Sequence, residues 1–137
     1  MENDILVFMQ ENPVLIGALL ILGAAFYRRE ASAGGAKLSL SEVIQVMNAD
    51  KGVLIDVRDK KEFDAGHVAN AIHIPHAKVA NSLSQLEKYK DKQIIVTDHM
   101  GQHAGSVGRI LLKEGYNTAR MRGGMSEWKQ DGLPLVK

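Results

Sequence analysis

Cysteine is absent from this chain of 137 residues, and its absence excludes several kinds of chemistry. Without a thiol the chain forms no disulfide, offers no thiolate ligand to a metal and carries no persulfide of its own. An excess of charge of one sign is also lacking, because 17 Lys and Arg face 16 Asp and Glu, a net charge of +1. The composition therefore gives no electrostatic reason to expect nucleic-acid binding. The length suits one domain with an appendage.

The longest hydrophobic run lies near the N-terminus and predicts a membrane anchor. It extends from Val14 to Tyr27 (VLIGALLILGAAFY) without a charged residue. As a helix this run would span roughly 21 Å, less than a hydrocarbon core of roughly 30 Å. Extension back to Ile5 gives about 34 Å, enough to span a bilayer with tilt. Pro13 suits a first helical turn, so we expect a helix over about 13–28 with a short apolar lead-in before it.

Two other interpretations of this run are open, a cleaved signal peptide and a buried core helix. A signal peptide needs basic residues ahead of its apolar part, whereas here Glu2, Asp4 and Glu11 precede the run and Arg28 and Arg29 follow it. A core helix is less suitable because the rest of the chain has its own complete set of elements. With the basic flank on the inside, we expect a single-pass protein of a bacterial plasma (inner) membrane whose C-terminal domain is cytoplasmic.

The composition changes after the basic flank and divides the chain into three parts. The segment ASAGGA at 31–36 contains only small residues and predicts a flexible linker. We therefore expect a membrane anchor over 1–30, a linker over 31–36 and a folded domain over 37–137.

The domain alternates short apolar strands with helices. Continuous β-branched and apolar runs predict strands at 53–56, 71–74, 94–97 and 118–121. Apolar spacing and capping signals, such as Ser39 with Glu42, predict helices at 39–47, 59–65, 77–88, 104–114 and 125–130. This alternation is typical of a mostly parallel α/β domain, in which ligands bind beyond the carboxyl ends of the strands. The loop at 98–103 follows one such end.

Six segments of the domain form a set: LIDVR (54–58), EFDAGHV (62–68), AIHIP (71–75), IIVTDHMGQHA (94–104), RGGMSEW (122–128) and GLP (132–134). Together they closely resemble a single-domain rhodanese of the sulfurtransferase family. The resemblance implies an α/β domain with a five-stranded, mostly parallel sheet flanked by helices, preceded here by the membrane-anchoring helix. In that family the strand-to-helix loop reads Cys-x-x-Gly-x-Arg-Ser, and its cysteine carries sulfur as a persulfide. Here Asp98 matches the cysteine, Gly101 is kept, and His103 and Ala104 match the arginine and serine.

Several other residues of these segments are expected to have structural roles. Asp56 and Arg58 match an Asp-x-Arg pattern of the family, and we expect an ion pair at the end of a strand. His67 is expected to be a packed, hydrogen-bonded histidine. Trp128 is expected to lie in the core.

Asp98 decides what the loop can do. A carboxylate cannot form a persulfide, and no other residue is a thiol, so the sulfur chemistry implied by the resemblance is lost. The carboxylate can accept the backbone N–H groups that would otherwise cradle a persulfide, and the helix dipole favours it. We therefore expect Asp98 to be an internal anion that stabilises the loop. A metal site is an alternative, formed by Asp98, His99 and His103, with His73 or His76 approaching. An aspartyl nucleophile for phosphoryl transfer would need a magnesium site and a second acid, which the loop does not offer.

The expected function is therefore binding rather than catalysis. We expect a catalytically inactive adaptor for membrane or membrane-proximal proteins, with no cofactor, no metal and no nucleic-acid partner. Its binding face is the former active-site loop: Asp98, His99, Met100, Gly101, Gln102 and His103. Two alternatives are a thiosulfate sulfurtransferase-like enzyme, as the family label implies, and a sensor of metal or small anions through Asp98, His99 and His103.

Overall fold

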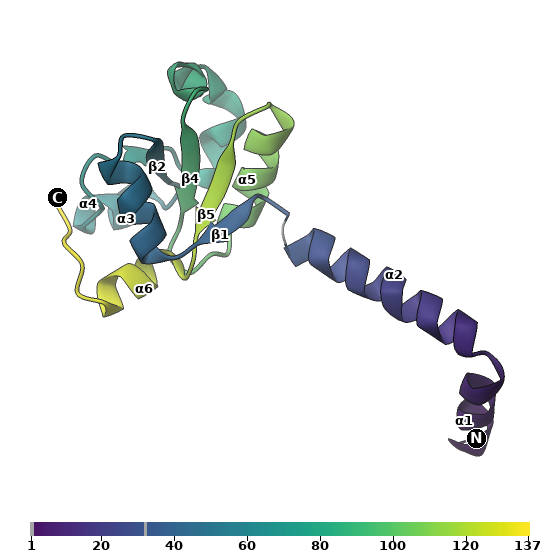
Figure 1. Cartoon of the computed structure of the whole chain (residues 1–137). Helices are drawn as coiled ribbons and strands as arrows, with labels where there is room; N and C mark the ends of the chain where they lie inside the picture. Colours follow the sequence, from purple (N-terminus) through teal and green to yellow (C-terminus); the bar gives the residue numbers. More distant parts are fainter. Residues whose placement is uncertain (1, 32) are drawn as a thin grey trace. The chain divides into compact units, whose positions relative to one another are not determined.

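The computed structural model describes residues 2–31 and 33–137, and the chain divides into two compact units at 32/33. Each unit has its own contacts, and the larger one holds the sheet (Figure 1).

The N-terminal unit consists of two helices, α1 (Glu2–Glu11) and α2 (Pro13–Ala31). Pro13 begins α2, as the sequence predicts, because its missing N–H group is not needed in the first turn. The two helices meet at an angle of 92°, so the apolar stretch is not one straight helix. Among the described residues no single helix is long and apolar enough to cross a bilayer, whereas the bent pair passes that test together by length and composition.

The C-terminal unit is built on a sheet of five described strands, all parallel. The strands are β1 (Ala36–Leu38), β2 (Gly52–Asp56), β3 (Ile72–His73), β4 (Gln93–Thr97) and β5 (Thr118–Met121), in the order β1-β5-β4-β2-β3. The predicted five-stranded parallel sheet is confirmed. The apolar strands β2 and β4 lie at its centre, where both faces are buried.

Helices cover both faces of the sheet (Figure 1), and a hydrophobic cluster lies on each face. On one face, α3 (Leu40–Asn48) and α6 (Gly124–Gln130) pack over Leu54 and Ile95. On the other, α5 (Ala104–Lys113) packs over Ile55 and Val96, with two 3₁₀ helices, η1 (His76–Asn81) and η2 (Leu83–Tyr89). The short helix α4 (Lys60–Ala65) follows β2. Because alternate strand residues point to opposite faces, each central strand contributes to both clusters.

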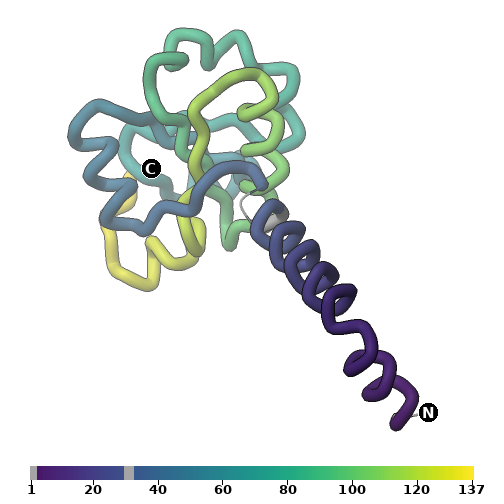
Figure 2. The backbone as a smooth tube through the Cα atoms, turned by 45° about the vertical axis from the view of Figure 1, so that its right-hand side comes forward, coloured from purple at the N-terminus to yellow at the C-terminus, as the bar shows by residue number. Residues whose placement is uncertain are grey.

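The segment predicted as one helix at 77–88 is instead the pair η1 and η2, interrupted at Ser82 (teal in Figure 2). The Ser82 backbone N–H bonds to the Val79 carbonyl three residues back, which is 3₁₀ spacing. Of the two 3₁₀ helices, only Val79 and Leu86 are buried. These two buried side chains attach the segment to the domain, so a continuous α-helix with one apolar face is not needed.

The predicted flexible linker also differs from the structure in its second half. Gly34 and Gly35 are buried within the C-terminal unit, and Ala36 already begins β1. Gly34 has φ +86°, and a side chain there would meet the Gly105 backbone oxygen on α5. In turn, a side chain at Gly108 would collide with the Gly34 carbonyl oxygen. The glycines at 34–35 therefore belong to a close backbone packing against α5.

Candidate functional site

The site loop, residues 98–103, connects the carboxyl end of β4 to the first turn of α5. It lies where a parallel α/β sheet is expected to bind ligands. Two backbone hydrogen bonds tie it to α6. The Met125 N–H donates to the Asp98 carbonyl oxygen (2.7 Å), and the Ser126 N–H donates to that of His99 (2.8 Å). A side chain at Gly124 would meet both carbonyls, so the glycine permits this close approach.

The Asp98 carboxylate is buried and accepts three backbone N–H groups, two from its own loop and one from the first residue of α5, as the sequence predicts. One oxygen, Oδ1, accepts from Gly101. The other, Oδ2, accepts from His103 (2.5 Å) and Ala104 (2.9 Å). Gly101 has φ +98°, a conformation that glycine adopts readily and that lets its N–H turn back towards the carboxylate. We call this arrangement the Asp98 cradle.

The rest of the site loop presents side chains to solvent. His99, Met100, Gly101 and Gln102 are exposed, and Met100 is 66% exposed. The Met100 N–H donates to the Gln102 side-chain oxygen at 2.8 Å, which adds a further internal hydrogen bond to those of the Asp98 cradle. The backbone of the loop is therefore held by internal hydrogen bonds around the buried Asp98 carboxylate, while its side chains are exposed.

The histidines near the loop are arranged by ring stacking. His103 stacks on His76 with ring centroids 3.8 Å apart and planes within 4°. His73 donates from Nε2 to the Arg58 carbonyl at 2.8 Å and stacks on Phe63. The described residues contain no group of three or more His, Asp or Glu side chains placed to hold a metal ion. The sequence-based metal site is therefore not assembled among the described residues, because the Asp98 oxygens accept backbone N–H groups and the rings of His76 and His103 stack on each other.

The predicted ion pair at the end of β2 is present and buried. Arg58 Nη2 lies 2.7 Å from Asp56 Oδ2, and Nε donates to the same carboxylate. Arg58 also donates to the Gly66 carbonyl, which ties the loop after α4 to the sheet. His67, expected to be packed and hydrogen-bonded, stacks on Phe63 and donates from Nδ1 to the Phe63 carbonyl. These roles are structural.

Two small pockets of opposite charge flank the site loop. The first, about 120 Å³, is lined by the acidic residues Asp59, Glu62 and Asp98 together with histidines and the paired Arg58. The second, about 140 Å³, is lined by Lys37, Arg120 and Arg122 and by the backbone of the loop. We call them the acidic pocket and the basic pocket. Sequence reasoning missed the basic pocket because Lys37 lies far from the two arginines in the chain.

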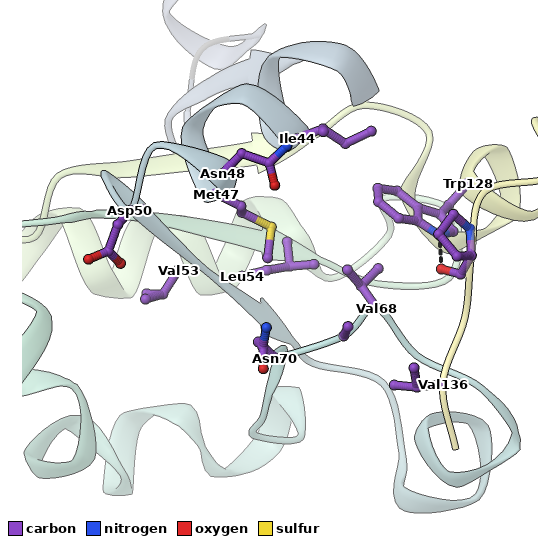
Figure 3. A pocket seen from close by; sticks show the side chains of 13 residues that line it. Ile44, Met47, Asn48, Asp50, Val53, Leu54, Val68, Asn70, Trp128 and Val136 are labelled. Carbon is purple, nitrogen blue, oxygen red and sulfur yellow. Dashed lines mark hydrogen bonds between the residues drawn. The ribbon is translucent and has the colours of Figure 1, made fainter.

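A third and larger pocket, about 620 Å³, lies apart from the site loop (Figure 3). It opens between α3, β2 and the C-terminal segment, with Met47, Leu54 and Val68 on its wall. Trp128 is buried, as predicted, and its Nε1 donates to the Pro134 carbonyl at 3.1 Å, the dashed line in Figure 3. No site-loop residue lines this pocket.

The fold and the position of the loop define a rhodanese-like protein, and residues 39–131 match the family model of the rhodanese-like domain. The chain belongs to this family. It is similar to the uncharacterized protein YibN of Escherichia coli (strain K12), with 28% identity over 140 residues that cover 98% of each chain. It is also similar to the thiosulfate sulfurtransferase GlpE of Pseudoalteromonas translucida, with 24% identity over 93 residues that cover 67% of this chain and 87% of GlpE.

The structure agrees with that assignment. A rhodanese-related protein from Thermoplasma volcanium superposes with a TM-score of 0.67 at 25% identity, covering 74% of this chain and 97% of the other. The match to YibN extends into the N-terminal unit, whereas the family model begins at residue 39. The N-terminal unit is therefore a feature that this chain shares with a whole-length relative rather than with the rhodanese-like domain itself.

Proposed function

We propose that this protein is a membrane-held rhodanese-like module that binds a protein partner through the site loop and does not transfer sulfur. The observation that carries the proposal is the Asp98 cradle. A carboxylate occupies the nucleophile position of the family and accepts three loop N–H groups. The loop keeps its shape, and therefore a surface, without the atom that the chemistry needs.

The missing thiol and the acidic pocket beside the loop support the loss of sulfur transfer. A persulfide enzyme needs a thiolate to attack the donor, and the chain has no cysteine at all. An anionic donor such as thiosulfate would also meet Asp59 and Glu62 in the acidic pocket. Like charges at such short range raise the cost of binding. The thiosulfate sulfurtransferase activity that the name of GlpE states is therefore not part of the function proposed for this protein.

The exposed part of the loop supports a binding role. His99, Met100 and Gln102 project from a backbone that is fixed at Asp98 and at α6. A preorganised loop loses little conformational entropy on binding. Met100, 66% exposed, is a flexible apolar side chain that adapts to a partner surface. The loop thus offers an apolar contact framed by hydrogen-bonding groups.

The N-terminal unit supports a location at a membrane. Large apolar residues on several sides of α2 are exposed, including Leu20, Ile21 and Phe26, each about 70% exposed. A helix that is apolar all round is typical of a lipid environment. Arg28 and Arg29 follow the apolar part, and by the positive-inside rule this basic flank supports a cytoplasmic location for the rhodanese-like domain.

Photo-crosslinking in the membranes of cells that make the full chain tests the binding face. A crosslinking amino acid at His99 lies in the site loop, and one at Gln45, exposed on α3, is the control. A discrete protein adduct from His99 and none from Gln45 is expected. Equal adducts from both positions, or none from either, would contradict the proposal.

Two further measurements separate the remaining parts of the proposal. Purified full chain is expected to form thiocyanate from thiosulfate and cyanide no faster than a heat-denatured sample. A single cysteine at Asn3 is expected to react with an impermeant reagent from outside the cell, because the chain has no other thiol. Labelling only after the cells are opened would reverse the orientation.

A further inference from the structure

The basic pocket combines three cations from the neighbouring parallel strands β1 and β5 and from the turn that follows β5. Lys37 on β1 is directly beside Arg120 on β5 in the strand register. Arg122 lies two residues beyond Arg120, and its backbone N–H still bonds to the Leu38 carbonyl, so it extends the same ladder. Residues two apart on a strand point to the same face. The register therefore brings the three side chains to one place, which Met100 and Gly101 close from the site loop.

The position of the Arg120 guanidinium is fixed by the backbone around it. Its Nε donates to the Gly35 carbonyl at 3.1 Å. A side chain at Gly105, in the first turn of α5, would lie 3.6 Å from its Nη1. Burial and, secondly, the nearby charge of Arg109 lower the pKa of Arg120. A positive charge held under these conditions favours a neighbouring anion.

None of the described residues that line this pocket is Asp or Glu, whereas Asp59, Glu62 and Asp98 line the acidic pocket across the same loop. The carboxylate of Glu127 lies beside the lining residue Gly123, so the excess of positive charge at the basic pocket is two rather than three. Lys37 and Arg122 are exposed and reach the mouth of the pocket. Guanidinium and ammonium groups together are the donors that proteins use for phosphate.

The size of the pocket limits what it can hold. Its volume is about 140 Å³, which equals roughly five water molecules at 30 Å³ each. A single tetrahedral oxyanion fits this space, and a whole nucleotide does not. We propose that the basic pocket, formed by Lys37, Arg120 and Arg122, binds one phosphate group.

Two sources can supply that chemistry. One is a soluble phosphate, either inorganic or a small monoester. The other is the headgroup of an anionic phospholipid, since Lys37 follows the end of α2 at Ala31 by only six residues. The lipid source rests on the proposed membrane anchor, and the soluble source does not.

The test uses full chain labelled with ¹⁵N-arginine in lipid nanodiscs and follows the Nε–Hε signal of Arg120. In phosphatidylcholine discs, inorganic phosphate is added at constant ionic strength against chloride. Phosphatidylcholine discs containing about one third phosphatidylglycerol, without phosphate, form the second arm. A saturable shift with phosphate in the first arm identifies a soluble phosphate site. The same shift in the second arm identifies the lipid headgroup.

Two matched variants locate the effect. Lys37→Gln with Arg122→Gln removes two exposed charges of the pocket and is expected to weaken binding at least tenfold. Lys113→Gln with Lys129→Gln removes the same charge elsewhere on the surface and is expected to change binding less than twofold. Trp128 fluorescence confirms that each variant is folded.

The proposal is overturned if phosphate gives only a non-saturating shift and phosphatidylglycerol gives none. It is equally overturned if the two double variants behave alike, because the effect would then be general surface charge. Neither result bears on the crosslinking at His99, so the proposal of a phosphate site and the proposal of a binding loop can be refuted independently.

Discussion

Replacement of Asp98 by alanine should destabilise the rhodanese-like domain, because it removes the acceptor of three backbone N–H groups. The N–H of Ala104 belongs to a buried residue, while Gly101 is exposed and His103 is half-buried. Water can replace the carboxylate at the last two positions but not readily at the first. A buried donor without a partner costs about 1–3 kcal/mol, and each rehydrated bond costs about 0.5–1 kcal/mol.

These contributions are reduced by the cost of burying the carboxylate itself, which the substitution relieves. The net expected loss for Asp98→Ala is about 3 kcal/mol, which lowers the melting temperature of a domain of this size by about 12–24 °C. Asp98→Asn keeps one carbonyl oxygen and should lose about 1–2 kcal/mol. The exposed Asp91→Ala is the matched control and should change stability by less than about 0.5 kcal/mol.

Urea unfolding of the full chain in detergent measures the effect through Trp128. This residue is the single tryptophan of the chain and is buried in the domain, so its fluorescence reports the unfolding of that unit alone. The midpoint should fall in the order wild type, Asp98→Asn, Asp98→Ala. A loss below about 0.5 kcal/mol for Asp98→Ala, no larger than that of a surface control, would show that the cradle does not hold the loop.

Three further predictions follow from the contacts. Gly108→Ala should lower the free energy of unfolding by about 1–3 kcal/mol, because its Cβ would meet the Gly34 carbonyl oxygen. Gly105→Ala makes only an ordinary van der Waals contact, so in the same urea assay it should leave the free energy of unfolding unchanged or raise it by up to about 1 kcal/mol. Burial raises the pKa of Tyr116 above its ordinary value of 10.0, so the contribution of its neutral hydroxyl to folding stability is complete below pH 10 and is lost as the pH rises through the folded-state pKa. The difference in stability between wild type and Tyr116→Phe should therefore shrink above pH 10. A difference that does not change with pH would contradict this. Asp98→Cys should place a thiol among the same N–H donors and lower its pKa below about 8.5, so that the pH midpoint of its alkylation by iodoacetamide falls below that of a free thiol.

The sheet could be predicted from sequence where strands are apolar on both faces. The runs at 53–56 and 94–97 form β2 and β4. Both faces of these strands are buried, so their residues are hydrophobic almost without interruption, and that pattern is visible in the sequence. Strand β1 could not be predicted from its own residues, because Ala36–Leu38 is three residues long and has no apolar pattern. It is a strand because β5 offers an edge at Ala119–Met121. Pairing at that separation is decided by the tertiary structure, not by local propensity.

The candidate site divides in the same way. The Asp98 cradle was predictable because the carboxylate, the glycine and the helix start lie within seven residues of one another. The stack of His76 on His103 was not, since it joins η1 to the site loop across the fold. The basic pocket needed the β1–β5 register, which the sequence does not display. Contacts between residues close in the sequence could therefore be predicted, whereas contacts between residues that only the fold brings together could not.

The opposite charges on the two sides of the loop bear on what kind of site this is. A rhodanese-like domain that had lost only its nucleophile would keep surroundings that attract an anionic donor. Here the acidic pocket presents Asp59 and Glu62 beside Asp98, while cations lie across the loop around Arg120. Charges of one sign grouped on each side of a rigid loop create a directed field, and such a field selects the orientation of a charged partner. A partner that engages the site loop would therefore be expected to bring a basic group to the acidic pocket and an acidic or phosphate group to the basic pocket.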